Sequence, residues 1–161
     1  MALTPAAHFT ITPADTAALD AAVDGTISPS GAWFNLLPRV VDDADIPDTP
    51  NSLAIFSRRG PAVPLATIVS AHERRGRIEP AEIGVQHAAA SRLADAWTTP
   101  PPEGIVTLSD HPKRGWVGSV PPEMRAHDYT RWLCQQLIAL CRVPLTGQID
   151  VLRYEPKRYG G

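Results

Sequence analysis

The sequence predicts an α+β fold in which a mostly antiparallel sheet carries two or three helices packed on one face, as a two-layer sandwich. Three observations lead to this class. Short β-rich runs are separated by proline, glycine and charged turns. Residues 123–142 have the apolar spacing of an amphipathic helix. A hairpin-like pair followed by a helix occurs twice, over residues 53–97 and 105–142, and local pairs of this kind favour antiparallel sheet.

The composition is that of a globular protein with one core. The chain has 161 residues, 43% hydrophobic and 20% charged, which is enough to bury a core in one domain. We predict a single domain over residues 1–161, with the proline-rich connector 98–103 joining two hairpin-plus-helix halves. The first five residues lack the basic and apolar regions of a signal peptide, and no apolar run reaches about 18 residues. We therefore expect a cytoplasmic protein without a membrane segment.

The first third of the chain predicts a strand, a helix and an acidic loop. Residues 8–12 alternate as a short strand, and residues 14–23 form an alanine-rich helix with Thr12 as its N-cap. Apolar residues dominate residues 32–41, and their periodicity leaves strand and short helix open. Residues 42–50 hold four aspartates and two prolines, which predicts a solvated loop without the ligand spacing of a calcium site.

The middle of the chain predicts a hairpin, a strand and a helix. Residues 52–57 and 63–70 are β-rich and flank a turn, so we expect them to pair. A charged turn follows at residues 72–77, and residues 82–85 form another strand. Residues 88–97 are expected to form a short helix.

The last third has the clearest periodicity. Residues 105–108 and 116–120 are predicted strands joined by the polar turn 110–115. The helix 123–142 follows, and residues 146–154 alternate as a final strand. The helix presents a core-facing stripe made of Tyr129, Leu133, Leu137 and Leu140.

The polar turn is the first candidate for a ligand site. Within seven residues it combines a carboxylate, an imidazole, two cations and an indole, which are Asp110, His111, Lys113, Arg114 and Trp116. Arginine can form paired hydrogen bonds with a carboxylate or phosphate, and lysine adds a point charge. The alternative is purely structural, because aspartate, proline and glycine also build turns whose charges are solvated.

Other candidates are His87 and the basic turns. His87 lies where a strand leads into a predicted helix, so it could face a ligand or simply cap and pack. Arg74 and Arg75 belong to a series of basic turns that also includes Arg58, Arg59, Lys157 and Arg158. These charges either form a basic rim or keep exposed hairpin ends soluble.

Signatures of metal, cofactor and nucleotide chemistry are absent from the sequence. No P-loop, dinucleotide-binding, nucleophile-elbow or paired-histidine motif occurs, so we predict no metal and no cofactor. Cys134 and Cys141 lie seven residues apart on the predicted helix, about 10 Å between Cα atoms, too far for a disulfide. We expect both to be reduced thiols.

The charge distribution and the missing motifs favour a binding function. Residues 1–50 hold one basic and seven acidic residues, whereas residues 51–161 hold 14 basic and 10 acidic residues. We predict a non-catalytic binding or accessory module for an anionic ligand or an acidic partner; the pI of about 6.2 disfavours nucleic acid. Two alternatives stay open: an enzyme with His111 or His87 as general acid or base, and a protein that self-associates as a homodimer.

Overall fold

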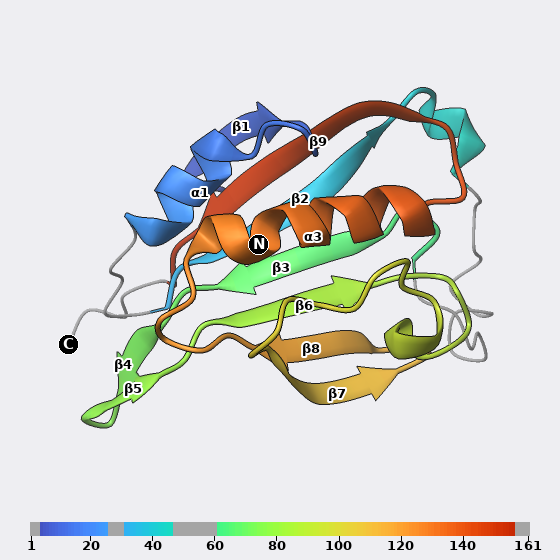
Figure 1. Cartoon of the computed structure of the whole chain (residues 1–161). Coiled ribbons are helices and arrows are strands. Elements are labelled where there is room, and N and C mark those ends of the chain that lie inside the picture. Colours follow the sequence, from blue (N-terminus) through green and yellow to red (C-terminus); the bar gives the residue numbers. More distant parts are fainter. Residues whose placement is uncertain (1–3, 26–30, 47–60, 157–161) are drawn as a thin grey trace.

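A seven-stranded sheet forms the centre of the fold, and every neighbouring pair of its strands is antiparallel (Figure 1). The computed structural model describes residues 4–25, 31–46 and 61–156. Within these ranges the strand order is β1-β9-β2-β3-β6-β8-β7. The strands are β1 (Ala7–Ile11), β2 (Trp33–Val40), β3 (Leu65–Val69), β6 (Glu82–Gln86), β7 (Val106–His111), β8 (Gly115–Ser119) and β9 (Leu145–Tyr154). The predicted mixture of helices with a mostly antiparallel sheet is confirmed.

The described residues form two α-helices, α1 (Ala17–Asp24) and α3 (Ala126–Leu140), which Figure 1 shows on the same side of the sheet. Polar contacts join the helices: the Thr130 hydroxyl of α3 donates to the carboxylate of Asp20 in α1. The Asp24 carboxylate at the end of α1 accepts the first N–H of α3, from Ala126, at 3.1 Å. Neither helix is long and apolar enough to cross a membrane.

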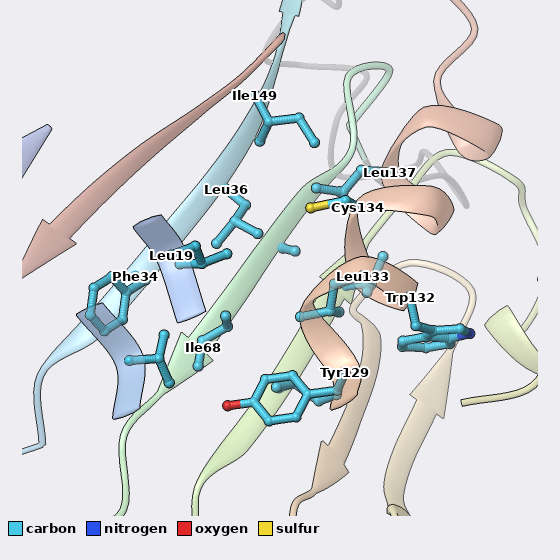
Figure 2. Packing of buried hydrophobic residues seen from close by; sticks show 14 of the residues in the cluster. Leu19, Phe34, Leu36, Ile68, Tyr129, Trp132, Leu133, Cys134, Leu137 and Ile149 are labelled. Carbon is cyan, nitrogen blue, oxygen red and sulfur yellow. The ribbon is translucent and has the colours of Figure 1, made fainter. Parts of the chain in front are cut away.

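The apolar stripe of α3 packs on the sheet as its periodicity predicts. Tyr129, Leu133 and Leu137 are buried, and Leu140 packs partly buried against the same core. Figure 2 shows Tyr129, Leu133 and Leu137 of α3 facing the strand residues Phe34, Leu36, Ile68 and Ile149. The core therefore lies between α3 and the central strands.

The stretch 32–41, which the sequence left open, contains the inner strand β2 over Trp33–Val40. Alternate side chains are buried, beginning with Phe34 and Leu36. Pro38 lacks an N–H group, and the pairing of β2 with β9 shifts register between Pro38 and Val40. Across this irregularity Gly147 of β9 adopts φ +90°. Burial on one face favours a strand because side chains alternate there with period two.

The predicted helix at residues 88–97 is wrong. This segment contains only a 3₁₀ turn, Leu93–Asp95, and the backbone of Ala90 takes a positive φ of 57° that an α-helix cannot contain. Leu93 is fully buried and anchors the segment to the core. Tertiary packing here overrides the helix propensity of an alanine-rich sequence.

The first helix begins later than predicted, at Ala17 rather than residue 14. Thr12 is not its N-cap, because Thr12 and Asp15 instead close a tight bridge through two backbone hydrogen bonds. The predicted strand 52–57 lies outside the described residues. Its expected partner β3 pairs with β2 and β6.

Strands from both sides of the connector 98–103 pair within the one sheet, since β6 lies beside β8 and β2 beside β9. The two hairpin-plus-helix halves are therefore not separate sheets. A second sheet of two strands, β4 (His72–Arg74) and β5 (Arg77–Glu79), projects from one end of the large sheet in Figure 1. It occupies the segment predicted as a charged turn.

Candidate functional site

The structure places the sequence-predicted site residues at two opposite ends of the sheet. Strand β6 connects these ends: Glu82 lies on the side of the β4–β5 ribbon, and Gln86 leads into His87. The β7–β8 turn lies at the His87 end, because Trp116 pairs with Val85. Arg74 and Arg75 therefore do not converge with Asp110, His111, Lys113, Arg114, Trp116 and His87 on one site.

Asp110 supports the segment at residues 93–95. Its Oδ1 accepts the N–H of Leu93 at 2.7 Å, and its Oδ2 accepts the N–H of Ala94 at 3.0 Å. Two otherwise unpaired N–H groups at the start of a 3₁₀ turn are thereby satisfied by a distant strand. The Asp110 carboxylate, which the sequence suggested as a ligand-binding group, therefore forms hydrogen bonds within the protein.

His111 and Gly115 shape the β7–β8 turn. His111 Nδ1 accepts the N–H groups of Lys113 at 3.1 Å and of Arg114 at 3.3 Å. Gly115 has φ +90°, which favours glycine. The side chains of Lys113 and Arg114 are exposed at the tip. The imidazole thus holds the turn, and a ligand-binding role for the two cations stays a prediction.

Trp116 belongs to the core and is only 1% exposed. Its indole N–H donates to Thr107 Oγ1 at 3.0 Å, and its ring meets the Trp132 ring edge-on at a centroid distance of 5.4 Å. The sequence named this indole as a candidate ligand-binding group of the charged turn. The alternation of β8 instead turns this side chain inward.

His87 is buried, 1% exposed, at the start of the segment after β6. Its Nδ1 accepts the N–H of Ala89 at 3.2 Å, and its Nε2 is buried without a hydrogen-bond partner among the described residues. Burial lowers the pKa of His87 below its ordinary value, and the charge of Asp110 opposes this effect in part. Neither His87 nor His111 lines one of the cavities described below or forms a hydrogen bond with a described carboxylate.

This burial predicts a pH dependence of stability. Because the folded state resists protonation of His87, the unfolded chain takes up the proton more readily as pH falls below about 6.5. We expect the free energy of unfolding to fall between pH 7.5 and pH 5.5, and to fall less in His87→Asn, which keeps an acceptor for Ala89. Urea titrations followed by circular dichroism measure this. An undiminished difference in His87→Asn would contradict the assignment.

The projecting ribbon carries three arginines, and we refer to β4, β5 and their turn as the arginine ribbon. Arg74 lies directly opposite Arg77, and Arg75 with Gly76 forms the turn with φ values of 53° and 73°. This turn has the positive φ angles of a tight type I′ hairpin. Within the part of the chain that the structure describes, none of the three arginines forms an ion pair. With Glu79 they line a surface hollow of about 520 Å³.

A second cavity, of about 540 Å³, lies at the same end of the molecule. It is bordered by the end of α1, the segment after β3, the segment between β5 and β6, and the segment from β8 into α3. Its wall is mostly apolar and includes Ile78 of the ribbon, which is 74% exposed. The sequence did not predict this cavity, because its walls come from four segments far apart in the chain. The apolar Ile78, directly after the charged turn, was its one local sign.

The described residues show neither a group of metal ligands nor an activated thiol at Cys134. No three His, Cys, Asp or Glu side chains there are grouped to hold a metal ion. Cys134 and Cys141 are free, as predicted. Burial, assisted by the charge of Asp20, raises the pKa of the Cys134 thiol to about 12. Cys134 therefore stays protonated at neutral pH and is a poor nucleophile.

The apolar surface for the self-association hypothesis lies on the edge strand β7. Val106 is 60% exposed and Leu108 is 54% exposed. A homodimer stays a prediction.

Comparisons with protein-family models, with curated protein sequences and with solved structures found no match.

Proposed function

We propose that the protein is a non-catalytic binding module that holds an acidic segment of a partner protein on its arginine ribbon. The observation that carries this proposal is the set of three exposed arginines on one projecting ribbon, without an ion pair among the described residues. In this proposal the molecule is a two-layer sandwich, and the ribbon extends beyond both layers.

The arrangement of the arginines disfavours a purely structural role. Like charges directly opposite each other on paired strands are destabilising, and Arg74 faces Arg77 in this way. A two-stranded ribbon is itself only marginally stable. Carboxylates from a partner would remove the repulsion and form paired hydrogen bonds with the guanidinium groups. The competing role is solubility of an exposed hairpin, which single charges would also provide.

The charge of the rest of the molecule favours an acidic polypeptide over nucleic acid. The chain has a net charge of −2. The acidic 3₁₀ turn Asp43–Asp45 follows β2 at the end of the sheet away from the ribbon. A short acidic segment can bind the ribbon without approaching these aspartates. A long polyanion such as DNA would be repelled by them.

Fluorescence anisotropy with labelled poly-L-glutamate tests the proposal. The variant Arg74→Glu/Arg75→Glu/Arg77→Glu is expected to bind about tenfold or more weakly, because three attractive contacts become repulsive. Wild-type binding should also weaken as the salt concentration rises, since the arginines are exposed.

The control variant Arg92→Glu/Arg131→Glu/Arg142→Glu makes the same change in net charge at exposed positions elsewhere. It is expected to keep most of the affinity. Equal losses in the two variants would show that net charge alone governs binding, and the proposal would fail. It would fail equally if single-stranded DNA bound the ribbon more tightly than poly-L-glutamate at the same salt concentration.

A further inference from the structure

The apolar cavity of about 540 Å³ lies next to the arginine ribbon but uses different side chains. Arg74, Arg77 and Glu79 of the ribbon line the surface hollow of about 520 Å³. Ile78 of the same ribbon lines the apolar cavity instead. Successive side chains of a strand point to opposite faces, so Ile78 projects from the other face of the ribbon than residues 77 and 79. A volume of this size is within the usual range of small-molecule sites.

Two hydroxyl groups belong to residues that line this cavity and have no partner in the described structure. Tyr129 is 2% exposed, and no hydrogen bond of its hydroxyl group occurs among the described residues. Figure 2 shows the hydroxyl at the end of the ring that points away from α3. Ser70 is 4% exposed, and its Oγ is buried without a partner. The Ser70 Oγ is fully enclosed, whereas the Tyr129 oxygen is not among the enclosed unpaired atoms. Tyr129 is therefore the hydroxyl that a ligand or water in the cavity can reach and satisfy.

The charges around the cavity select against a charged ligand at its base. Asp24 lines the cavity and caps α3, and its charge, with that of Asp20, adds to burial in raising the pKa of Tyr129. A carboxylate placed near the Tyr129 hydroxyl would be repelled by both aspartates. Arg125 also lines the cavity, and its single positive charge offsets that of Asp24. The lining therefore carries no net charge.

We propose that this cavity binds a small neutral molecule with an apolar body and one carbonyl or hydroxyl oxygen, which accepts the hydroxyl hydrogen of Tyr129. The apolar body would cover Ile78 and contact the prolines between β8 and α3. This site is independent of the arginine ribbon, so either proposal can fail without the other.

The experiment uses N-phenyl-1-naphthylamine, a neutral fluorescent probe, and its displacement by 2-octanone, octane and octanoate. Wild type is expected to bind the probe and to prefer 2-octanone to octanoate. Ala71→Trp places a large side chain at an exposed position of the cavity wall and should weaken probe binding about tenfold or more. Ala139→Trp, the same change at an exposed position of α3, should leave it unchanged.

Tyr129→Phe removes only the proposed hydrogen-bond donor. It is expected to weaken 2-octanone binding about three- to tenfold and to leave octane binding unchanged. Thermal melts confirm that each variant is folded before its affinity is compared. Absence of probe binding in folded wild type overturns the proposal, as does equal binding in wild type and Ala71→Trp. A preference for octanoate, or unchanged 2-octanone binding in Tyr129→Phe, overturns the assignment of a neutral oxygen to Tyr129.

Discussion

Replacing Trp116 by alanine is expected to lower the free energy of unfolding by about 3–5 kcal/mol, the usual range for deleting a buried tryptophan side chain. Trp116 is 1% exposed and packs edge-on against Trp132, which in turn contacts Trp97 at a centroid distance of 6.3 Å. Its loss would leave a void beside Trp132. It would also leave Thr107 without the indole N–H that it now accepts.

Two substitutions separate packing from the hydrogen bond and provide a scale. Trp116→Phe keeps an aromatic ring in the core and is expected to lose about 1–2 kcal/mol. Trp33→Ala removes a partly exposed indole that stacks on Tyr154 and should cost less than Trp116→Ala. Urea unfolding followed by circular dichroism measures all three. If Trp116→Ala lowered the free energy of unfolding by less than about 1 kcal/mol, the indole would not be a core residue. The prediction that it binds a ligand would then be favoured.

Gly115→Ala should be the second most destabilising change, at about 2–4 kcal/mol. A Cβ atom at this position would clash with the carbonyl oxygen of Val85, and the backbone has φ +90°. Both neighbouring strands are fixed by their pairing, so the contact can be relieved only by moving β6 or β8. Thermal and urea unfolding both report the loss.

Gly147→Ala is the matched control, because Gly147 has the same φ of +90° but no atom within 4 Å of an added Cβ. It therefore measures backbone strain alone, at about 1 kcal/mol. The difference between the two variants is the effect of the contact with Val85. If the two glycines gave equal losses, the close approach of β8 to β6 would be incorrect.

Trp116 and Gly115 belong to the charged stretch that the sequence marks as the best ligand site. Loss of binding in a variant of this stretch cannot be distinguished from unfolding unless the stability of the variant is measured as well. The arginine ribbon and the apolar cavity lie at the other end of the sheet, where exposed side chains can be changed with little effect on the core.

Local periodicity by itself determined the framework. The apolar stripe of Tyr129, Leu133 and Leu137 predicted α3 and the face that it buries. Alternation predicted β9, whose Ile149 and Val151 are fully buried. Such features depend on neighbours within a few residues, because helices and strands repeat over that range. The spacing of Cys134 and Cys141 likewise showed that they are not paired with each other.

Only the tertiary structure decided what the polar residues do. Asp110 resembles a ligand-binding carboxylate in sequence, yet it accepts N–H groups from Leu93 and Ala94, 17 and 16 residues away. Asp128 caps α3 locally by accepting the N–H of Arg125, but the N–H of Ala126 is accepted by Asp24, 102 residues earlier in the chain. The apolar cavity depends on four segments that meet only in the folded chain. A hydrogen bond or cavity wall requires closeness in space, which strand order and packing decide and the spacing of residues along the chain does not record.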